Sequence, residues 1–105
     1  MLSRKDRLSR ANFPRSARTI YSSPLLSVKL IRNDVEHNRF GVVISAKAVP
    51  GAALRHRLKR KLLAAAKTLS NVRADMIFIP RSGMRDATQK QIRAEFDTIR
   101  TILHS

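Results

Sequence analysis

The clearest periodic pattern in this chain lies in residues 51–69. Leucine and alanine recur there at intervals of three and four residues, so at about 100° per residue they fall on one face of a helix. This apolar face consists of Leu54, Leu58, Leu62, Ala65, Ala66 and Leu69. Because Ala, Leu, Lys and Arg are also strong helix formers, the segment predicts an amphipathic helix that packs on a core through this face.

Two segments before this helix predict β-strands. Residues 26–31 place apolar side chains at alternate positions, which is typical of a strand with one buried face. Residues 40–45 form a β-branched run that predicts a second and more buried strand. Between them, Asn33 and Asp34 form a turn signal, and residues 34–39 leave room for a further short strand or hairpin.

The N-terminal segment predicts a short helix. Pro14 follows Phe13, and proline is favoured at the first position of a helix. A helix over residues 14–20 places Phe13, Ala17 and Ile20 along one side. Spacing alone leaves open whether Phe13 is a core anchor or a binding residue.

The residues after the amphipathic helix predict one more strand and one more helix. Residues 76–79 form a short apolar strand that ends at Pro80. Thr88 and Gln91 have the spacing of a capping box, which marks the start of a helix that runs to about His104. The apolar side of this helix consists of Ile92, Phe96, Ile99 and Leu103.

The order of these elements is helix, two or three strands, helix, strand, helix, which predicts an α+β fold with helices packed against a single sheet. The strand, helix and strand within residues 40–79 predict a βαβ crossover between parallel strands, and handedness statistics favour a right-handed one. The chain has 105 residues and shows no internal repeat, linker or low-complexity segment. We therefore expect residues 1–105 to form a single domain.

Charge changes the interpretation of the amphipathic helix. The chain has 22 Lys and Arg residues against 7 Asp and Glu, a net charge of +15, and no acidic residue lies between Glu36 and Asp75. The basic residues of the helix are Arg55, Arg57, Lys59, Arg60, Lys61 and Lys67. A solvated surface helix normally mixes both signs, whereas here the like charges repel one another. The pattern therefore favours a nucleic-acid partner over a plain solvated face.

The sequence offers no catalytic constellation of its own. Cysteine is absent, which excludes disulfides, thiolate zinc sites and cysteine nucleophiles and is typical of a reducing cytosol. The three histidines and three glycines are scattered, so neither a metal-ligand spacing nor a phosphate-binding glycine loop is present. No apolar run approaches the roughly 20 residues of a membrane span, and no signal peptide is evident. If the chain takes part in a reaction, another molecule supplies the reactive groups.

Two adjacent segments resemble the signature of the bacterial ribonuclease P protein subunit. In that family a strand that ends in a small residue and paired lysines is followed, about ten residues later, by Arg-Asn-Arg-hydrophobic-Lys-Arg on a helix. The matching stretches here are Gly41-Val-Val-Ile-Ser45, Lys47 and Arg55-His56-Arg57-Leu58-Lys59-Arg60. The resemblance extends to Arg7-Leu8 with Phe13 and to residues 74–81, so it covers nearly the whole chain.

Some positions depart from the family pattern. His56 replaces the usual Asn, and Ala46 replaces the first of two lysines. Ala17 lies where a second aromatic residue usually follows Phe13, and Leu63-Ala64 lies where Arg-Glu is common. These departures bear on contacts with RNA, and they are typical of a divergent member of the family.

The resemblance implies a fold and a function. The fold is a two-layer α/β sandwich of order αβββαβα, like that of some ribosomal proteins, with a four-stranded sheet and a left-handed βαβ crossover. This replaces the right-handed crossover that statistics favour. The function is that of the protein subunit of a cytoplasmic ribonucleoprotein, which removes the 5′ leader of precursor tRNA. The catalytic RNA holds the Mg²⁺ ions, and the resemblance implies neither a membrane nor a small-molecule cofactor.

The resemblance also assigns site residues. Those expected to bind the catalytic RNA are Arg55, His56, Arg57, Lys59, Arg60, Lys61 and Lys67. Those expected to bind the leader are Phe13, Arg7 and Lys47. Guanidinium groups suit bidentate contacts with phosphates, and an aromatic ring stacks on an unpaired base at about 1–3 kcal/mol. Two alternatives stay open, because Arg55 can instead pair with Asp75 or the C-terminal helix, and Lys59 can simply lie along the apolar face.

Two other functions compete with this one. A structural RNA-binding protein, such as a small ribosomal protein, would need the same basic helix and no enzyme. A DNA-binding protein would place the helix in a major groove. The second is the weaker, because the helix lacks base-reading Asn or Gln and the chain shows no dimerisation seam.

Overall fold

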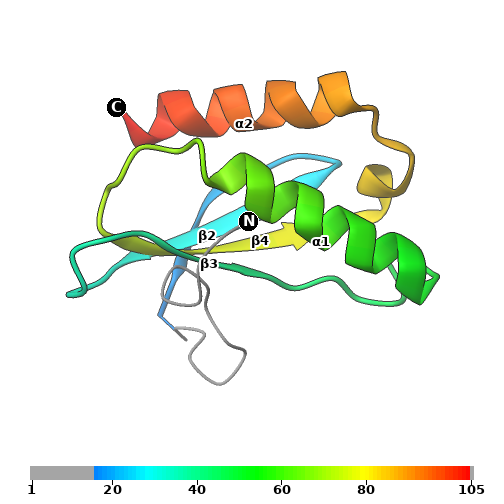
Figure 1. Cartoon of the computed structure of the whole chain (residues 1–105), viewed down its shortest axis with the longest axis horizontal. Helices are drawn as coiled ribbons and strands as arrows, with labels where there is room; N and C mark the ends of the chain where they lie inside the picture. Colours follow the sequence, from blue (N-terminus) through cyan, green and yellow to red (C-terminus); the bar gives the residue numbers. More distant parts are fainter. Residues whose placement is uncertain (1–15, 105) are drawn as a thin grey trace.

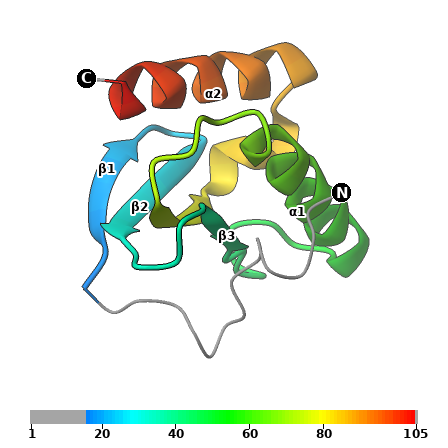
Figure 2. The same cartoon turned by 60° about the vertical axis from the view of Figure 1, so that its left-hand side comes forward.

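A four-stranded sheet forms one layer of the structure, and two helices form the other (Figure 1). The structure is a computed structural model that describes residues 16–104. The strands are β1 (Arg18–Ser22), β2 (Leu26–Arg32), β3 (Arg39–Val42) and β4 (Ala74–Pro80). The helices are α1 (Ala52–Ala66) and α2 (Gln89–Leu103), with a 3-10 helix, η3 (Ser82–Asp86), just before α2. Both long helices lie on the same face of the sheet (Figure 2).

The strands follow the order β1-β2-β4-β3 across the sheet. Strand β4 pairs antiparallel with β2 and parallel with β3, and β1 pairs antiparallel with β2. Helix α1 connects β3 to β4, so the predicted crossover between parallel strands is confirmed. The left-handed sense of this crossover stays a prediction. The order from the first strand onward, βββαβα, agrees with the order that the resemblance implied.

The core lies between the sheet and the two helices. Alternate residues of β2 point into it, as the period-two pattern predicted, together with Met76 and Phe78 of β4, and the apolar faces of α1 and α2 cover them. Phe78 is fully buried at the centre, with its ring centroid 6.1 Å from that of Phe40 and 5.4 Å from that of Phe96. These aromatic contacts join β3, β4 and α2, so the sheet and the last helix share one core.

The prediction of a helix over residues 14–20 is wrong for the part of this segment that the structure describes. Residues 18–20 belong to β1, in which Arg18 pairs with Leu30 and Thr19 with Lys29. The ladder with β2 decides the conformation here, and it outweighs the local helix signal of a proline upstream. Pro14, like the first helix of the αβββαβα order, lies outside the described residues.

The loop before β3 also differs from the prediction, because no strand forms within residues 33–38. The side chain of Asn38 explains this, since it binds the backbone that a strand would otherwise pair with. Its Nδ2 donates to the carbonyl oxygen of Ser70 at 2.8 Å, and its Oδ1 accepts from the amides of Val72 at 3.0 Å and Ala74 at 3.3 Å. The strand predicted over residues 40–45 ends at Val42.

Both predicted amphipathic helices form, with α2 capped as expected. Thr88 Oγ1 accepts from the amide of Gln91 at 3.1 Å, and Gln91 Oε1 accepts from the amide of Thr88 at 2.8 Å. This reciprocal pair satisfies two amides at the start of α2, so the predicted capping box is confirmed. In α1 the predicted apolar face is buried at Leu58 and Leu62, and Leu63, which lies beside that face, is buried as well.

A buried ion pair fixes the register of β3 against β4. Asp75 is only 4% exposed, and its two carboxylate oxygens accept from Nε and Nη2 of Arg39 at 2.8 Å each. Asn33 Nδ2 donates to the same carboxylate at 2.9 Å. The hydrogen bonds that Arg39 donates to Asp75 raise the pKa of Arg39, so the guanidinium stays charged. The bidentate geometry holds both strands and the loop after β2 together.

A second polar cluster joins the β1–β2 hairpin to α2. Tyr21 Oη donates to Glu95 Oε2 at 2.6 Å, and Ser23 Oγ donates to the other oxygen of the same carboxylate. Burial and the neighbouring Glu95 carboxylate raise the pKa of Tyr21, because both disfavour a phenolate at this position.

We expect Tyr21 to titrate above its ordinary pKa of about 10 in the folded protein. Tyr21 is the single tyrosine and the chain has no tryptophan, so phenolate absorbance at about 295 nm reports this residue alone. Because the pKa is higher folded than unfolded, the cluster's contribution to the free energy of unfolding is complete below about pH 10 and is lost as pH rises through the folded-state value. Glu95→Gln should move the titration down, and an unmoved midpoint would contradict the contact.

Candidate nucleic-acid interface

Helix α1 exposes most of its basic residues to solvent. It starts after Gly51, whose φ of 95° lies in the region that favours glycine, and its buried residues orient the helix. Arg55 is half-buried, while the other predicted RNA-binding residues are exposed. These exposed residues are His56, Arg57, Lys59, Arg60, Lys61 and Lys67.

Helical spacing divides these residues into three lines. His56, Arg60 and Lys67 lie opposite the line of Leu58 and Leu62, and they border Leu63, which is buried and lies seven residues after His56 on the same side of the helix. The other lines flank them, with Arg57 and Lys61 on the edge toward α2 and Arg55 and Lys59 on the edge away from it. The arrangement is a convex basic surface that extends over the full length of α1.

The carboxylates of the protein lie elsewhere. Of the six within residues 16–104, four contact partners outside α1, and Asp34 and Glu36 lie in the exposed part of the loop before β3. The four contacts are Asp75 with Arg39, Glu95 with Tyr21, Asp86 with Arg85 and Asp97 with Arg100. In this part of the chain, no ion pair involves a cation of α1. Among residues 16–104, the like charges of α1 therefore lack the partners that a solvated helix of mixed sign would have.

The alternative pairing of Arg55 does not form. Asp75 is occupied by Arg39, and Arg55 Nη1 instead donates to the carbonyl oxygen of Val49 at 3.0 Å. This bond fastens the loop before α1 to the first turn of the helix. Arg55 thus has a structural contact of its own in a half-buried position.

The residues expected to bind the leader are described only in part. Lys47 is exposed in a turn that Ser45 stabilises, because Ser45 Oγ accepts from the amide of Ala48 at 3.1 Å. The turn comes four residues before the start of α1, and Lys47 carries an exposed positive charge there. Arg7 and Phe13 lie outside the described residues, and their expected role in leader binding stays a prediction.

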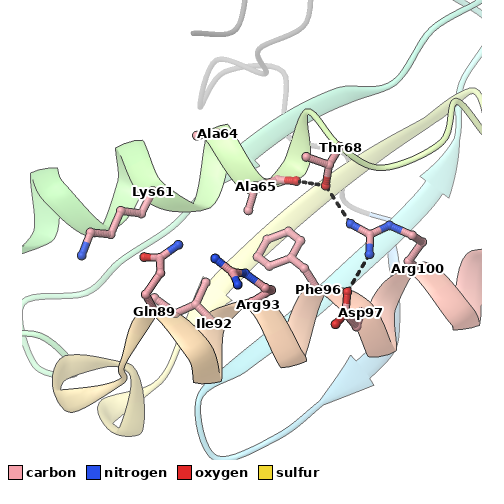
Figure 3. Close-up of a pocket in the computed structure, with 10 residues that line it drawn as sticks. All are labelled: Lys61, Ala64, Ala65, Thr68, Gln89, Ile92, Arg93, Phe96, Asp97 and Arg100. Atoms are coloured by element: carbon pink, nitrogen blue, oxygen red, sulfur yellow. Dashed lines mark hydrogen bonds and ion pairs between the residues drawn. The ribbon is translucent and has the colours of Figure 1, made fainter.

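Two basic residues of α2 were not predicted as part of the site. Arg93 and Arg100 line a groove between α1 and α2, together with Lys61 (Figure 3). Their spacing in the sequence, with Arg93 and Arg100 seven residues apart on one helical edge, is a detectable signal. This spacing indicates a site only when α1 is known to lie beside that edge of α2.

The described residues contain neither a metal-binding cluster nor a helix that could span a membrane. Within residues 16–104, no three His, Asp or Glu side chains lie close enough together to hold a metal ion. In the same part of the chain, neither helix has the length and apolar character needed to cross a bilayer.

Comparison with known proteins identifies the fold and the family. The family model described as Ribonuclease P matches residues 2–104. The ribonuclease P protein of Staphylococcus aureus is 25% identical, with a TM-score of 0.76, and the match covers 92% of this chain and 94% of that one. No curated protein sequence matches the chain.

Two further solved structures share the fold. A mutant of the Staphylococcus aureus ribonuclease P protein, with defective mRNA degradation activity, is 24% identical to this chain, with a TM-score of 0.78. The match covers 95% of this chain and 89% of that one. The ribonuclease P protein of Thermotoga maritima is 22% identical, with a TM-score of 0.59 and coverage of 85% and 81%. Together with the family match over nearly the whole length, the basic helix on this sheet shows that the chain belongs to the ribonuclease P protein family.

Proposed function

We propose that the convex basic surface of α1 binds the RNA of ribonuclease P, and that this RNA supplies the catalytic groups. The family shows that the chain is the protein subunit of this enzyme, with an RNA partner. One observation supports placing the RNA on α1: four of its Lys and Arg side chains are exposed, as is Lys67 directly after the helix, and none of the five has a carboxylate partner within the described residues. Phosphates supply the missing charge, and each contact releases a counterion.

We propose that the RNA, and not the protein, binds the Mg²⁺ ions. The described residues offer no cluster of carboxylates or histidines that fits a metal ion, so we assign no metal ligand to this chain. Cations on α1 lower the repulsion between phosphates where they dock. We therefore propose that the protein reduces the Mg²⁺ concentration at which the RNA is active.

Precursor tRNA is the proposed substrate, with its 5′ leader bound by Lys47, Phe13 and Arg7. The exposed position of Lys47 beside α1 supports this for one of the three. An unpaired leader has accessible bases and phosphates, which suit an aromatic ring and two basic side chains. We also propose that residues 1–105 form one domain, which acts in the cytoplasm.

The test combines the protein with the catalytic RNA of its own source organism and follows precursor tRNA cleavage. We expect cleavage at a low Mg²⁺ concentration at which the RNA alone is nearly inactive. Phe13→Ala and Lys47→Ala should each weaken binding of leader-bearing tRNA while binding of mature tRNA is unchanged, because mature tRNA has no leader to contact.

Two results would contradict the proposal. If the protein gave no stimulation at any salt concentration, a purely structural RNA-binding role would be the better explanation. If both variants bound leader-bearing and mature tRNA with the wild-type ratio of affinities, the leader would lie elsewhere on the protein.

A further inference from the structure

The groove between α1 and α2 combines an apolar floor with a basic rim (Figure 3). Its volume is about 370 Å³, at the lower end of the roughly 300–1,000 Å³ that small-ligand sites occupy. The floor includes Ala65, Ile92 and Phe96. The rim carries Lys61 from α1 and Arg93 from α2, which extend into the space between the helices.

One end of the groove is closed by a chain of hydrogen bonds. Arg100 Nη1 donates to Asp97 Oδ1 at 2.7 Å, and Arg100 Nη2 donates to Thr68 Oγ1 at 2.8 Å. Thr68 Oγ1 in turn donates to the carbonyl oxygen of Ala65 at 2.7 Å. These bonds tie the end of α1 to α2 and hold Arg100 in place. Lys61 and Gln89 lie at the opposite end (Figure 3).

The charges of the groove are unbalanced. Asp97 is the single carboxylate of its lining, and the ion pair with Arg100 occupies it. Within residues 16–104, Lys61 and Arg93 form neither an ion pair nor a side-chain hydrogen bond. One cation from each helix thus borders the apolar floor, which is the complement of a group with one negative end and one flat apolar side.

We propose that this groove binds one unpaired nucleotide of the ribonuclease P RNA. Its phosphate lies between Lys61 and Arg93, and its sugar and base cover the apolar floor. The proposal rests on the docking of that RNA on α1, because Lys61 belongs both to the basic surface of α1 and to the rim of the groove. An RNA strand that crosses α1 therefore reaches the groove without leaving the protein.

The dimensions favour a single nucleotide over other RNA elements. A duplex is wider than the space between two adjacent helices, whereas an unstacked nucleotide offers a base face and a phosphate on one small unit. A second copy of this chain is disfavoured as the occupant, because each copy carries a net charge of +15. A small inorganic anion matches the two cations and leaves the apolar floor uncovered.

Two single substitutions on α2 test the proposal in the assembled complex with the RNA. Arg93→Ala removes a rim cation, and Lys90→Ala removes an exposed cation of the same helix that does not line the groove. We expect Arg93→Ala to weaken RNA binding about five- to tenfold near 0.1 M salt and to reduce the slope of log K against log salt by about one. Lys90→Ala should leave both quantities at the wild-type values.

A cross-linking experiment locates the RNA directly. Because the chain has no cysteine, Gln89→Cys and Ala94→Cys each provide a unique attachment site for a photoreactive group. Gln89 lies at the mouth of the groove and Ala94 is exposed on α2 outside it. We expect Gln89→Cys to cross-link to one or a few adjacent nucleotides and Ala94→Cys to give no such product.

Arg60→Ala separates failure of this proposal from failure of the RNA face on α1. If Arg60→Ala weakens binding while Arg93→Ala behaves like Lys90→Ala, α1 binds the RNA and the groove proposal is overturned. If Arg60→Ala also has no effect, the docking on α1 is wrong and the groove proposal falls with it. The groove proposal would also be overturned if Gln89→Cys cross-linked to a protein or to a small phosphate-bearing molecule and not to RNA.

Discussion

Replacing Arg57, Arg60 and Lys67 together with alanine is expected to weaken binding to the ribonuclease P RNA by about two powers of ten near 0.1 M salt. All three side chains are exposed on α1 and lack an ion-pair partner within the described residues. Each lost phosphate contact should lower the slope of log K against log salt by about 0.7 to 0.9, so the triple variant loses between two and three units of slope. Titration at several salt concentrations measures both quantities.

The matched control removes three exposed cations from other elements. Arg32, Arg85 and Lys90 lie on β2, η3 and α2, and their triple alanine variant has the same net charge as the α1 variant. We expect it to bind nearly as the wild type does, apart from a small change common to any loss of net charge. Equal losses for the two triples would mean that total charge, and not the surface of α1, determines RNA binding. Circular dichroism should show unchanged helix content in both.

Asp75→Ala is expected to lower the free energy of unfolding by about 3–5 kcal/mol, because it leaves Arg39 with an unpaired charge at the edge of the core. Asp75 is buried, and it accepts hydrogen bonds from both Arg39 and Asn33. At about 4–8 °C per kcal/mol for a domain of this size, the midpoint of thermal unfolding should fall by more than about 10 °C. Urea titration followed by circular dichroism measures the change.

Asp97→Ala is the control for this prediction. Asp97 also pairs with an arginine, at 2.7 Å, but its side chain is 65% exposed. Exposed pairs contribute up to about 1 kcal/mol, so Asp97→Ala should have a much smaller effect on unfolding. If both substitutions cost the same, the Arg39–Asp75 pair does not hold the parallel strands together.

Elements with a strong local pattern could be predicted from the sequence. The apolar face of α1 and the capping box of α2 are both encoded within a few turns of helix, and the structure contains them where they were expected. Residues 18–20 were predicted wrongly, because the signal of Pro14 is local whereas the pairing of β1 with β2 is not. In that case tertiary contacts outweighed the local preference.

The positions of the basic residues could be predicted, but their neighbours could not. The charge pattern of α1 is visible in the sequence, yet the contact between Arg39 and Asp75 joins residues 36 positions apart. It follows from the register of β3 against β4, which no local pattern specifies. The groove could not be predicted from a local pattern either, because Lys61 and Arg93 form one site only when the two helices lie side by side on the sheet.

The order of the strands has a consequence for protein synthesis. Strand β4 is the last strand to be made, yet it lies between β2 and β3, which therefore do not pair with each other. A nascent chain that has emerged only as far as α1 has no partner for β3 and no complete surface for the leucines of α1 to cover. The basic helix consequently leaves the ribosomal exit tunnel before its tertiary structure exists, and ribosomal RNA is the polyanion nearest to it. Because α2 contributes Ile92, Phe96 and Ile99 to the same core, that core is complete only when the last helix has emerged as well.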